Sequence, residues 1–513
     1  MRASVRVAAL LSLLMVLFIL LGCGHDSSKA EAGDDGLAPA DRTDYAGDDD
    51  SEPPFEPEFQ KAFAYFVAFK PFDPEEARQQ LTALKATGTE WISLDIALAQ
   101  DAWNSPRIFA VYDDPSESSE IPYRYMPNAW HHTPSDEELV QFVQIARELG
   151  FKIMFKPHIH PLDTGMYSYM DYNHNGQMDP DEEATKRDPG WPGTVHMESD
   201  AEWSVWFRNY TDILVHYLNL LEPYGIEQVC IGDELCGTYS RYWQWEKLID
   251  DLRRRTGFDG AITCAFDWWI TIAHKYRALL DLAPLVGISH VDILDGILLV
   301  GLQGQTTQLA FEEGRKEVVA ADIFAERFDP PNKPHGNHWY RKLDYVGINP
   351  YFPLTRTATP SYEEILAGWT SFPLDELNLK EMIEDALESL GIPLGLFLAL
   401  VGLDEEDLER INFVECIEEF HEDVGKPLIF TEGPGYLSVD GATIFPANWY
   451  LTVADENQEI QRDAYRAVFE TFWDVKYIYA YYWWEWVEQG PKGYSPRGKL
   501  AEDVLVEWYA KEW

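Results

Sequence analysis

The chain has 513 residues, of which 46% are hydrophobic and 25% are charged, and its formal net charge at pH 7 is −48. A field this negative repels nucleic acid phosphates and anionic lipid headgroups, which excludes nucleic acid as a partner and favours neutral ligands. The length and apolar content allow one large core, for which the 19 Trp, 27 Tyr and 26 Phe residues supply bulky rings.

The N-terminus has the pattern of an export signal. Arg2 and Arg6 precede an apolar run over residues 7–21, which is short for a membrane-spanning helix and matches the n-region and h-region of a signal peptide. The run ends in Leu-Leu-Gly-Cys, which resembles the lipobox of bacterial lipoproteins. We therefore expect residues 1–22 to be removed and Cys23 to carry the lipid that anchors an exported protein to the cell envelope. A plain signal peptide or an uncleaved anchor is the alternative.

Residues 23–55 are rich in Asp, Glu, Ser, Ala and Gly and have almost no large apolar side chains. Such a segment cannot bury enough surface to order itself, so we predict an acidic disordered tether followed by one folded domain over 56–513. No Cys-x-x-Cys metal spacing occurs among the cysteines of this domain, which are Cys230, Cys236, Cys264 and Cys416. An exported protein can form disulfides, so their pairing stays open.

Short apolar runs alternate with longer amphipathic ones along the domain, which predicts strands that alternate with helices. The expected strands are 63–69, 91–96, 152–158, 228–234, 261–267, 343–349, 426–432 and 477–484. Helices are expected between them, for example from Asp73 to about Thr87 and from a capping box formed by Ser135 and Glu138. Eight strands in this order imply a parallel sheet, most simply a closed (β/α)8 TIM barrel, with an open doubly wound sheet as the alternative.

Two connections in this pattern are too long for simple loops. Residues 281–342 follow the fifth expected strand, and residues 353–425 follow the sixth. We expect both segments to form helical insertions on the loops around the barrel, since loops of this length without secondary structure are uncommon in compact domains.

Two of the expected strands end in a glutamate at the point where the apolar pattern stops. Val-Cys-Ile-Gly-Asp precedes Glu234, and Leu-Ile-Phe-Thr precedes Glu432. Parallel barrels place catalytic groups at the carboxyl ends of their strands, so these two side chains would face one another across the barrel mouth. Retaining glycoside hydrolysis needs two carboxyl groups about 5 Å apart, one as acid and one as nucleophile. The sequence therefore favours a two-carboxylate glycosidase.

Five motifs in chain order resemble glycoside hydrolase family 113. They are Lys-Pro-His-Ile-His (156–160), Ile-Gly-Asp-Glu-Leu (231–235), Tyr-Val-Gly-Ile-Asn-Pro-Tyr (345–351), Thr-Glu-Gly-Pro-Gly-Tyr (431–436) and Tyr-Trp-Trp-Glu-Trp (482–486). The family belongs to a clan of retaining (β/α)8 enzymes related to β-mannanases. The resemblance implies that Glu234 is the general acid/base, that Glu432 is the nucleophile, and that a surface-anchored enzyme cleaves a neutral, mannan-like β-linked glycan.

The sequence departs from this pattern at two places. In the wider clan the residue before the acid is often Asn, whereas here it is Asp233, a second carboxyl group beside Glu234 that can raise the pKa of the acid. After the nucleophile, Gly-Pro-Gly over 433–435 replaces the more usual Ile-Gly, which leaves the geometry of that loop open.

Further polar and aromatic side chains near the strand ends are candidates for binding the sugar. Tyr351 is expected to donate a hydrogen bond to Glu432, and a tryptophan after the last strand is expected to stack on a pyranose ring. The two histidines of the third strand alternate about Ile159, so both point to one side. The candidate substrate-binding residues are His158, His160, Asp233, Asp267, Trp268, Tyr351, Trp484 and Trp486. Core packing is the alternative for the aromatic members. For the histidines the alternatives are satisfied polar packing and a zinc pair without a clear third ligand.

A twelve-residue segment over 171–182 matches the EF-hand calcium loop. It has oxygen side chains at positions one, three, five and nine, Gly176 at position six and a glutamate at position twelve. The expected metal-binding residues are Asp171, Asn173, Asn175, Gln177, Asp179 and Glu182. No amphipathic helix precedes the segment, so we expect one structural Ca²⁺ site rather than a paired sensor, with a solvated acidic turn as the alternative.

Taken together, the sequence predicts an exported, monomeric glycosidase that needs no organic cofactor. Two other functions stay open. A non-catalytic glycan-binding lipoprotein could use the same barrel, because a fold alone does not prove activity. A barrel hydrolase for another polymer would differ in the bond that it cuts.

Overall fold

The computed structural model describes residues 55–67, 72–127, 129, 131–170, 184–187, 190–282, 307–311, 315–325, 338–374, 379–444, 446–447, 454–487 and 490–513. The expected signal peptide, the lipidation site Cys23, the tether up to residue 54 and the calcium loop over 171–182 lie outside the described residues. Within the described part, every helix is too short or too polar to cross a membrane.

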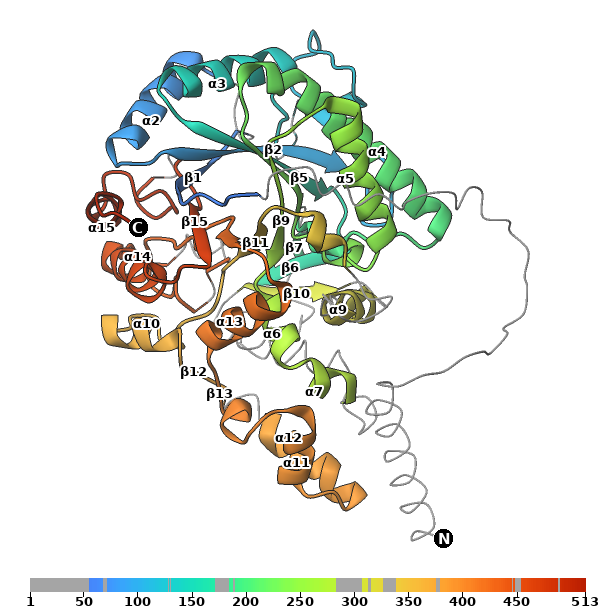
Figure 1. Ribbon diagram of the computed structural model, residues 1–513, viewed down its shortest axis with the longest axis vertical. Coiled ribbons are helices and arrows are strands. Elements are labelled where there is room, and N and C mark those ends of the chain that lie inside the picture. The colour runs from blue at the N-terminus through green and yellow to red at the C-terminus, as the bar shows by residue number, and fades with distance from the viewer. Residues whose placement is uncertain are drawn as a thin grey trace.

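Eight parallel strands form a closed barrel (Figure 1). They are β1 (Gln60–Phe66), β2 (Trp91–Gln100), β5 (Lys152–Pro161), β8 (Gln228–Asp233), β9 (Ala261–Asp267), β11 (Val346–Asn349), β14 (Leu428–Phe430) and β15 (Ile478–Trp483). Their order around the barrel is β1-β15-β14-β11-β9-β8-β5-β2, and the pairing of β1 with β2 closes it. The (β/α)8 barrel expected from the sequence is confirmed, and each expected strand overlaps one of these eight.

Most of the described helices surround the barrel, and others belong to the long connections (Figure 1). They are α2 (Pro74–Ala86), α3 (Asp136–Glu148), α4 (Asp200–Leu221), α5 (Tyr242–Thr256), α6 (Trp269–Lys275), α7 (Arg277–Leu282), α9 (Arg315–Ala325), α10 (Tyr362–Gly368), α11 (Leu379–Leu390), α12 (Leu394–Val401), α13 (Phe413–Val424), α14 (Gln458–Phe472) and α15 (Leu500–Tyr509). Short 3-10 turns are η1 (Pro192–Thr194), η2 (Glu222–Tyr224), η3 (Cys236–Thr238), η5 (Trp339–Lys342) and η7 (Glu406–Leu408).

Local sequence explains where the first helices begin. The Asp73 side chain accepts hydrogen bonds from the backbone N–H groups of Glu75 and Glu76 at the start of α2. At the start of α3, the Ser135 hydroxyl accepts from the Glu138 N–H while the Glu138 carboxylate accepts from the Ser135 N–H, which is the expected capping box. Both caps satisfy N–H groups that the helices leave unpaired.

The insertions contain short strands in addition to the expected helices. β10 (Thr307–Phe311), from the insertion after β9, pairs with β6 (Met166–Met170), and β6 pairs with β7 (Ala184–Arg187), in one antiparallel sheet. In the insertion after β11, β12 (Phe372–Pro373) pairs with β13 (Arg410–Ile411). The backbone of these short strands needs hydrogen-bond partners, which segments distant in sequence supply.

A shorter extension follows the second strand of the barrel. β3 (Ile108–Tyr112) runs antiparallel to β2, and β4 (Tyr123–Tyr125) pairs with β3. None of the four described cysteines forms a disulfide, and all four are buried. The open question of disulfide pairing is therefore answered in favour of buried thiols, which pack as small apolar groups.

Candidate active site

The two glutamates reach the same end of the barrel. Glu234 directly follows β8, and Glu432 follows β14 by two residues. Because all eight strands are parallel, their carboxyl ends meet at one mouth, where such barrels hold their active sites. The two carboxyl groups interact electrostatically, and the Tyr351 hydroxyl interacts with both of them. The structure thus brings together the pair that the sequence singles out.

Glu234 lies in a polar but cation-poor setting. The Asn349 side-chain amide donates to its Oε1 at 3.0 Å, and the Trp191 indole Nε1–H donates to its Oε2 at 3.1 Å. Burial raises the pKa of Glu234 well above its ordinary value, and the nearby carboxylates of Asp267 and Asp233 raise it further. Its backbone φ is +48°, a left-handed conformation that costs energy in a residue other than glycine and is found at functional sites.

Glu432 lies among donors and cations. The Tyr351 hydroxyl donates to its Oε2 at 3.0 Å, which is the hydrogen bond expected from the sequence. The Lys156 ammonium donates to Oε1, and the His158 Nε2 lies 3.7 Å from the same oxygen. Burial raises the pKa of Glu432 to about 8, and Asp233 adds to this, whereas Lys156 and His158 lower it.

These contacts give the two glutamates different protonation behaviour. Lys156 and His158 contact Glu432 directly, but neither cation makes an ion pair with Glu234. As the pH rises, Glu432 therefore loses its proton first, and Glu234 keeps its proton longer. The form with an ionised Glu432 and a protonated Glu234 is the one that retaining glycoside hydrolysis requires.

Lys156 is the centre of a buried charge network. Its Nζ lies 3.0 Å from Oδ1 of Asp233 and 3.8 Å from Oδ2 of Asp95, in addition to its contact with Glu432. The ammonium also lies 5.7 Å from the centre of the Trp484 ring. Although burial opposes its charge, Asp233, Glu432 and Asp95 hold the pKa of Lys156 well above its ordinary value. The lysine therefore stays charged and compensates the buried carboxylates around it.

His158 and Asp233 form the second half of this network. The His158 Nδ1 lies 3.1 Å from Oδ2 of Asp233, and its Nε2 lies 3.5 Å from Oδ2 of Asp95. Burial and Lys156 oppose protonation of the ring, yet Asp233 raises the pKa of His158 to about 10. Burial likewise opposes ionisation of Asp233, but Lys156 and His158 hold its pKa well below the ordinary value.

This network predicts that the stability of the fold decreases between about pH 6.5 and 10. Because the folded-state pKa of His158 is raised from 6.5 to about 10, its stabilising contribution is complete below pH 6.5 and is lost as the pH rises through 10. The raised pKa of Glu432 acts in the same direction at lower pH. We expect the Tm from calorimetry to fall across this window and to fall less steeply in His158→Gln. Equal slopes for the parent and the variant would contradict this assignment.

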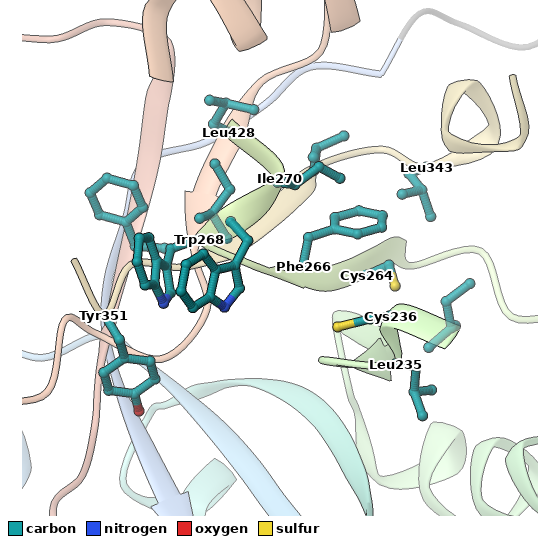
Figure 2. Packing of buried hydrophobic residues seen from close by; sticks show 14 of the residues in the cluster. Leu235, Cys236, Cys264, Phe266, Trp268, Ile270, Leu343, Tyr351 and Leu428 are labelled. Atoms are coloured by element: carbon teal, nitrogen blue, oxygen red, sulfur yellow. The ribbon is translucent and has the colours of Figure 1, made fainter. Parts of the chain in front are cut away.

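Two predicted sugar-contacting tryptophans lie in the core instead. Trp486 is fully buried, donates its indole N–H to the Gln80 carbonyl at 2.9 Å and packs edge-on against Phe63. Trp268 packs among other buried hydrophobic residues (Figure 2), and its ring stacks on that of Trp269 with centres 3.8 Å apart. Aromatic residues near a strand end can point into either the mouth or the layer between strands and helices, and the sequence pattern does not distinguish the two.

Trp484 and Asp267 lie beside the charged site. Trp484 is half-buried, and its ring centre lies 5.8 Å from His158 and 5.4 Å from Phe66. Asp267 is buried, accepts a hydrogen bond from the Cys236 thiol at 2.8 Å and raises the pKa of Glu234. Trp484 is therefore a partly accessible residue beside the two cations that contact Glu432, whereas Asp267 acts through a neighbouring carboxyl group.

His160 shares a face with His158 but has a different partner. The two rings are nearly parallel, 6° apart, with centres 5.8 Å apart, which agrees with the expected alternation about Ile159. The His160 Nδ1 lies 2.9 Å from the Gly190 carbonyl oxygen, and burial lowers the pKa of His160 well below its ordinary value. A neutral ring therefore donates to this carbonyl. The nearest partners of His158, by contrast, are the carboxylates of Asp233 and Asp95.

The conformation and packing of the loop after Glu432 require its two glycines. Gly433 has a φ of +138°, which a residue with a side chain rarely adopts. A Cβ at Gly435 would lie 2.8 Å from the Trp484 carbonyl oxygen. The Gly-Pro-Gly sequence therefore lets this loop pack directly against the end of β15.

Several site residues are not among the sequence candidates. Lys156 lies two residues before His158 on the same strand, so the alternation of a strand places it on the same face as the two histidines. Asp95 is a lone acid within an apolar strand. The sequence pattern could therefore have indicated both Lys156 and Asp95. Asn349 ends β11 inside a quoted motif and also donates to Asp233 at 3.1 Å. Trp191 lies in an irregular segment, where no sequence pattern indicates its contact with Glu234.

Comparison with known proteins identifies the family of the chain. The model of Glycoside Hydrolase Family 113 matches residues 62–282 and 405–506. No curated protein matches the chain. Among solved structures, a GH113 β-mannanase from Alicyclobacillus acidocaldarius in complex with ManMIm is 18% identical with a TM-score of 0.50, and the match covers 89% of this chain and 98% of that chain.

Two further solved structures are more distant in shape. A complex of a GH113 β-1,4-mannanase is 16% identical with a TM-score of 0.48, over 89% of this chain and 100% of that chain. A β-glucuronidase from Ruminococcus gnavus in complex with D-glucuronic acid is 10% identical with a TM-score of 0.39, over 88% of this chain and 49% of that chain. The Alicyclobacillus structure supports the barrel fold, and the family model covers more than half of the sequence. The chain belongs to glycoside hydrolase family 113.

Proposed function

We propose that this protein is a retaining glycoside hydrolase that cleaves a neutral, mannan-like β-linked glycan, with Glu432 as nucleophile and Glu234 as general acid/base. The observation that carries the proposal is the contrast between the two carboxyl groups at one barrel mouth. Glu432 is held by the Lys156 cation and the Tyr351 hydroxyl, whereas Glu234 is held by neutral N–H donors.

In the first step, a carboxylate oxygen of Glu432 attacks the anomeric carbon of the bound sugar. The bond from this carbon to the glycosidic oxygen breaks, and the Glu234 proton moves to that oxygen, so the leaving group departs as a neutral alcohol. Lys156 and Tyr351 hold the attacking carboxylate in place by their contacts with its two oxygens.

In the second step, the ionised Glu234 removes a proton from a water molecule. The water oxygen bonds to the anomeric carbon, the ester bond to Glu432 breaks, and Glu432 leaves as a carboxylate. Two inversions at one carbon return the product with the original anomeric configuration.

The substrate class rests on charge and on aromatic surface. The net charge of −48 disfavours anionic glycans, and the half-buried Trp484 ring near Glu432 suits the apolar face of a pyranose. The Alicyclobacillus acidocaldarius structure is a GH113 β-mannanase by its title, which favours β-linked mannose units as the first substrate to test. The buried Asp233 is bonded to Lys156, His158 and Asn349, so we assign it to charge balance rather than to sugar contact.

Hydrolysis of a panel of neutral β-linked glycans tests the proposal. We expect reducing ends to be released from at least one β-linked mannan or manno-oligosaccharide, and ¹H NMR of the first product to show retained anomeric configuration. Binding across the panel without any release of reducing ends would favour a non-catalytic glycan-binding protein. Release of an inverted product would contradict the two-step mechanism.

We further propose that the enzyme is exported and anchored by a lipid on Cys23, as its N-terminal sequence indicates. The acidic tether over residues 23–55 would hold the barrel away from the membrane. An intact mass that includes a diacylglyceryl group on Cys23 supports this anchor, and a Cys23→Ser protein that stays in the membrane fraction would contradict it.

We also propose a structural Ca²⁺ site in the loop over 171–182. The described strands on either side of this loop fit the role, because Tyr169 of β6 pairs with Ala184 of β7, which brings the two ends of the loop together. Ca²⁺ prefers several oxygen ligands, which the loop sequence supplies. We expect millimolar Ca²⁺ to raise the Tm more than Mg²⁺ does and Asp171→Ala to abolish the difference. Equal Tm values with chelator and with Ca²⁺ would contradict the site.

A further inference from the structure

Trp191 contacts the proposed proton donor from a segment that is itself firmly held. Its indole Nε1–H donates to Oε2 of Glu234 at 3.1 Å, and its side chain is half-buried. The indole is the only described donor to this oxygen among the contacts of Glu234, since Asn349 donates to the other oxygen, Oε1. One oxygen of the acid is therefore held by the N–H edge of an indole in a partly accessible residue.

Hydrogen bonds on both sides of Trp191 fix its backbone. His160 donates to the carbonyl of the preceding residue, Gly190, at 2.9 Å. The Thr194 hydroxyl donates to the Trp191 carbonyl at 3.0 Å, and the Arg315 guanidinium donates to the Thr194 carbonyl at 2.8 Å. The ring therefore projects from a braced turn, η1, rather than from a loose loop.

The Trp191 ring also rests on a glycine. A Cβ at Gly193 would lie 2.4 Å from Cζ2 of the indole, a distance that no side chain can occupy. The ring is thus supported from one side by backbone while part of its surface stays accessible. A rigid aromatic group of this kind loses little conformational entropy when a ligand stacks on it.

The position of the ring relative to the two glutamates indicates which sugar it meets. Trp484 lies beside Lys156 and His158, which contact the nucleophile Glu432, whereas Trp191 contacts the acid Glu234. The acid delivers its proton to the glycosidic oxygen, so a group beside the acid borders the sugar that leaves. Trp484 therefore lies on the side of the nucleophile, and Trp191 lies on the side of the acid.

We propose that Trp191 forms the platform for the sugar unit on the leaving-group side and positions the Glu234 carboxyl group for proton transfer. This inference rests on the proposed glycosidase function. Donation from Asn349 and Trp191 to the two carboxyl oxygens fixes the plane of that group. In the second step the same indole N–H stabilises Glu234 as the ionised base, because a donor favours the charged form of a carboxyl group.

Two substitutions separate the two roles of Trp191. Trp191→Phe keeps an aromatic ring but removes the N–H donor, so the pKa that limits kcat/KM on the alkaline side should rise by about half to one pH unit. Trp191→Ala also removes the ring, so the KM for a manno-oligosaccharide that extends past the cleaved bond should rise about three- to tenfold. The leaving group of a dinitrophenyl glycoside departs without a proton and contains no sugar. Both variants should therefore cleave this substrate at a rate within about twofold of the parent, where the rate measured is that of the glycosylation step.

The experiment uses the full chain and a matched control. Trp243 in α5 is 66% exposed, and Trp243→Ala should change none of these quantities. The inference would be overturned if both Trp191 variants had the KM of the parent for the oligosaccharide and an unchanged pKa on the alkaline side of the kcat/KM profile. Equal losses on both substrates together with a lowered Tm would also overturn it, because they indicate a purely structural residue. A parent that cleaves neither substrate would instead overturn the glycosidase proposal itself.

Discussion

Replacing Glu432 by glutamine should lower the turnover of the cleaved glycan by about 10⁴-fold or more. The amide is nearly the same size and can still accept the Tyr351 hydrogen bond, but it cannot attack the anomeric carbon as a carboxylate. The initial rate of release of reducing ends measures the effect. The size of the loss follows from removing the group that forms the covalent bond, rather than a group that only positions it.

Glu148→Gln provides the matched control for this change. Glu148 ends α3, and its side chain is 62% exposed in an ion pair with Arg78. Surface pairs of this kind contribute little, so both activity and Tm should stay close to those of the parent. If Glu432→Gln kept more than about one-hundredth of the parental rate while Glu148→Gln behaved as expected, Glu432 could not be the nucleophile.

Replacing Lys156 by methionine should lower the free energy of unfolding by about 3–5 kcal/mol, because it leaves buried carboxylates without their cation. Asp95, Asp233 and Glu432 all lie within ion-pair distance of the Lys156 Nζ, which is fully buried. Loss of the cation also raises the pKa of Glu432, so any remaining activity should have its acid limb at higher pH. Denaturant unfolding and a pH–rate profile measure the two effects.

Lys152→Met is the control on the same strand. Lys152 begins β5, and its side chain is 43% exposed in an ion pair with Glu58, so its loss should cost about 0–1 kcal/mol. If the two methionine variants were equally stable, the buried network would not depend on the Lys156 charge. An unshifted acid limb in Lys156→Met would show that the lysine does not tune Glu432.

Much of the fold could be predicted from the sequence because each barrel strand is a short apolar run bounded by polar segments. Runs such as Val-Cys-Ile-Gly before Glu234 are buried on both faces, which is typical of parallel strands. The pairing of β10 with β6 could not be predicted, since it joins residues about 140 positions apart and depends on how the insertion after β9 meets the loop after β5.

The site could be predicted in part for a similar reason. Glu234, Glu432 and Tyr351 stand where strands end, and the barrel topology alone brings such positions together. The contact of Trp191 with Glu234 could not be predicted in this way, because Trp191 lies in an irregular turn and not at the end of a strand. The tryptophans near the end of the last strand also show the limit, since Trp484 faces the charged network while Trp486 turns into the core only two residues later.

Covalent labelling of the nucleophile tests the central claim most directly. The full chain would be incubated with a 2-deoxy-2-fluoro-β-glycosyl fluoride of the sugar that it cleaves, and the digested protein would be analysed by peptide mass spectrometry. The fluorine slows both steps, and the fluoride leaving group needs little protonation, so the glycosyl-enzyme should accumulate. We predict one label per chain, on Glu432, and no label in Glu432→Gln. A label on another residue, or turnover with inversion and no label, would contradict the assignment of Glu432 and Glu234.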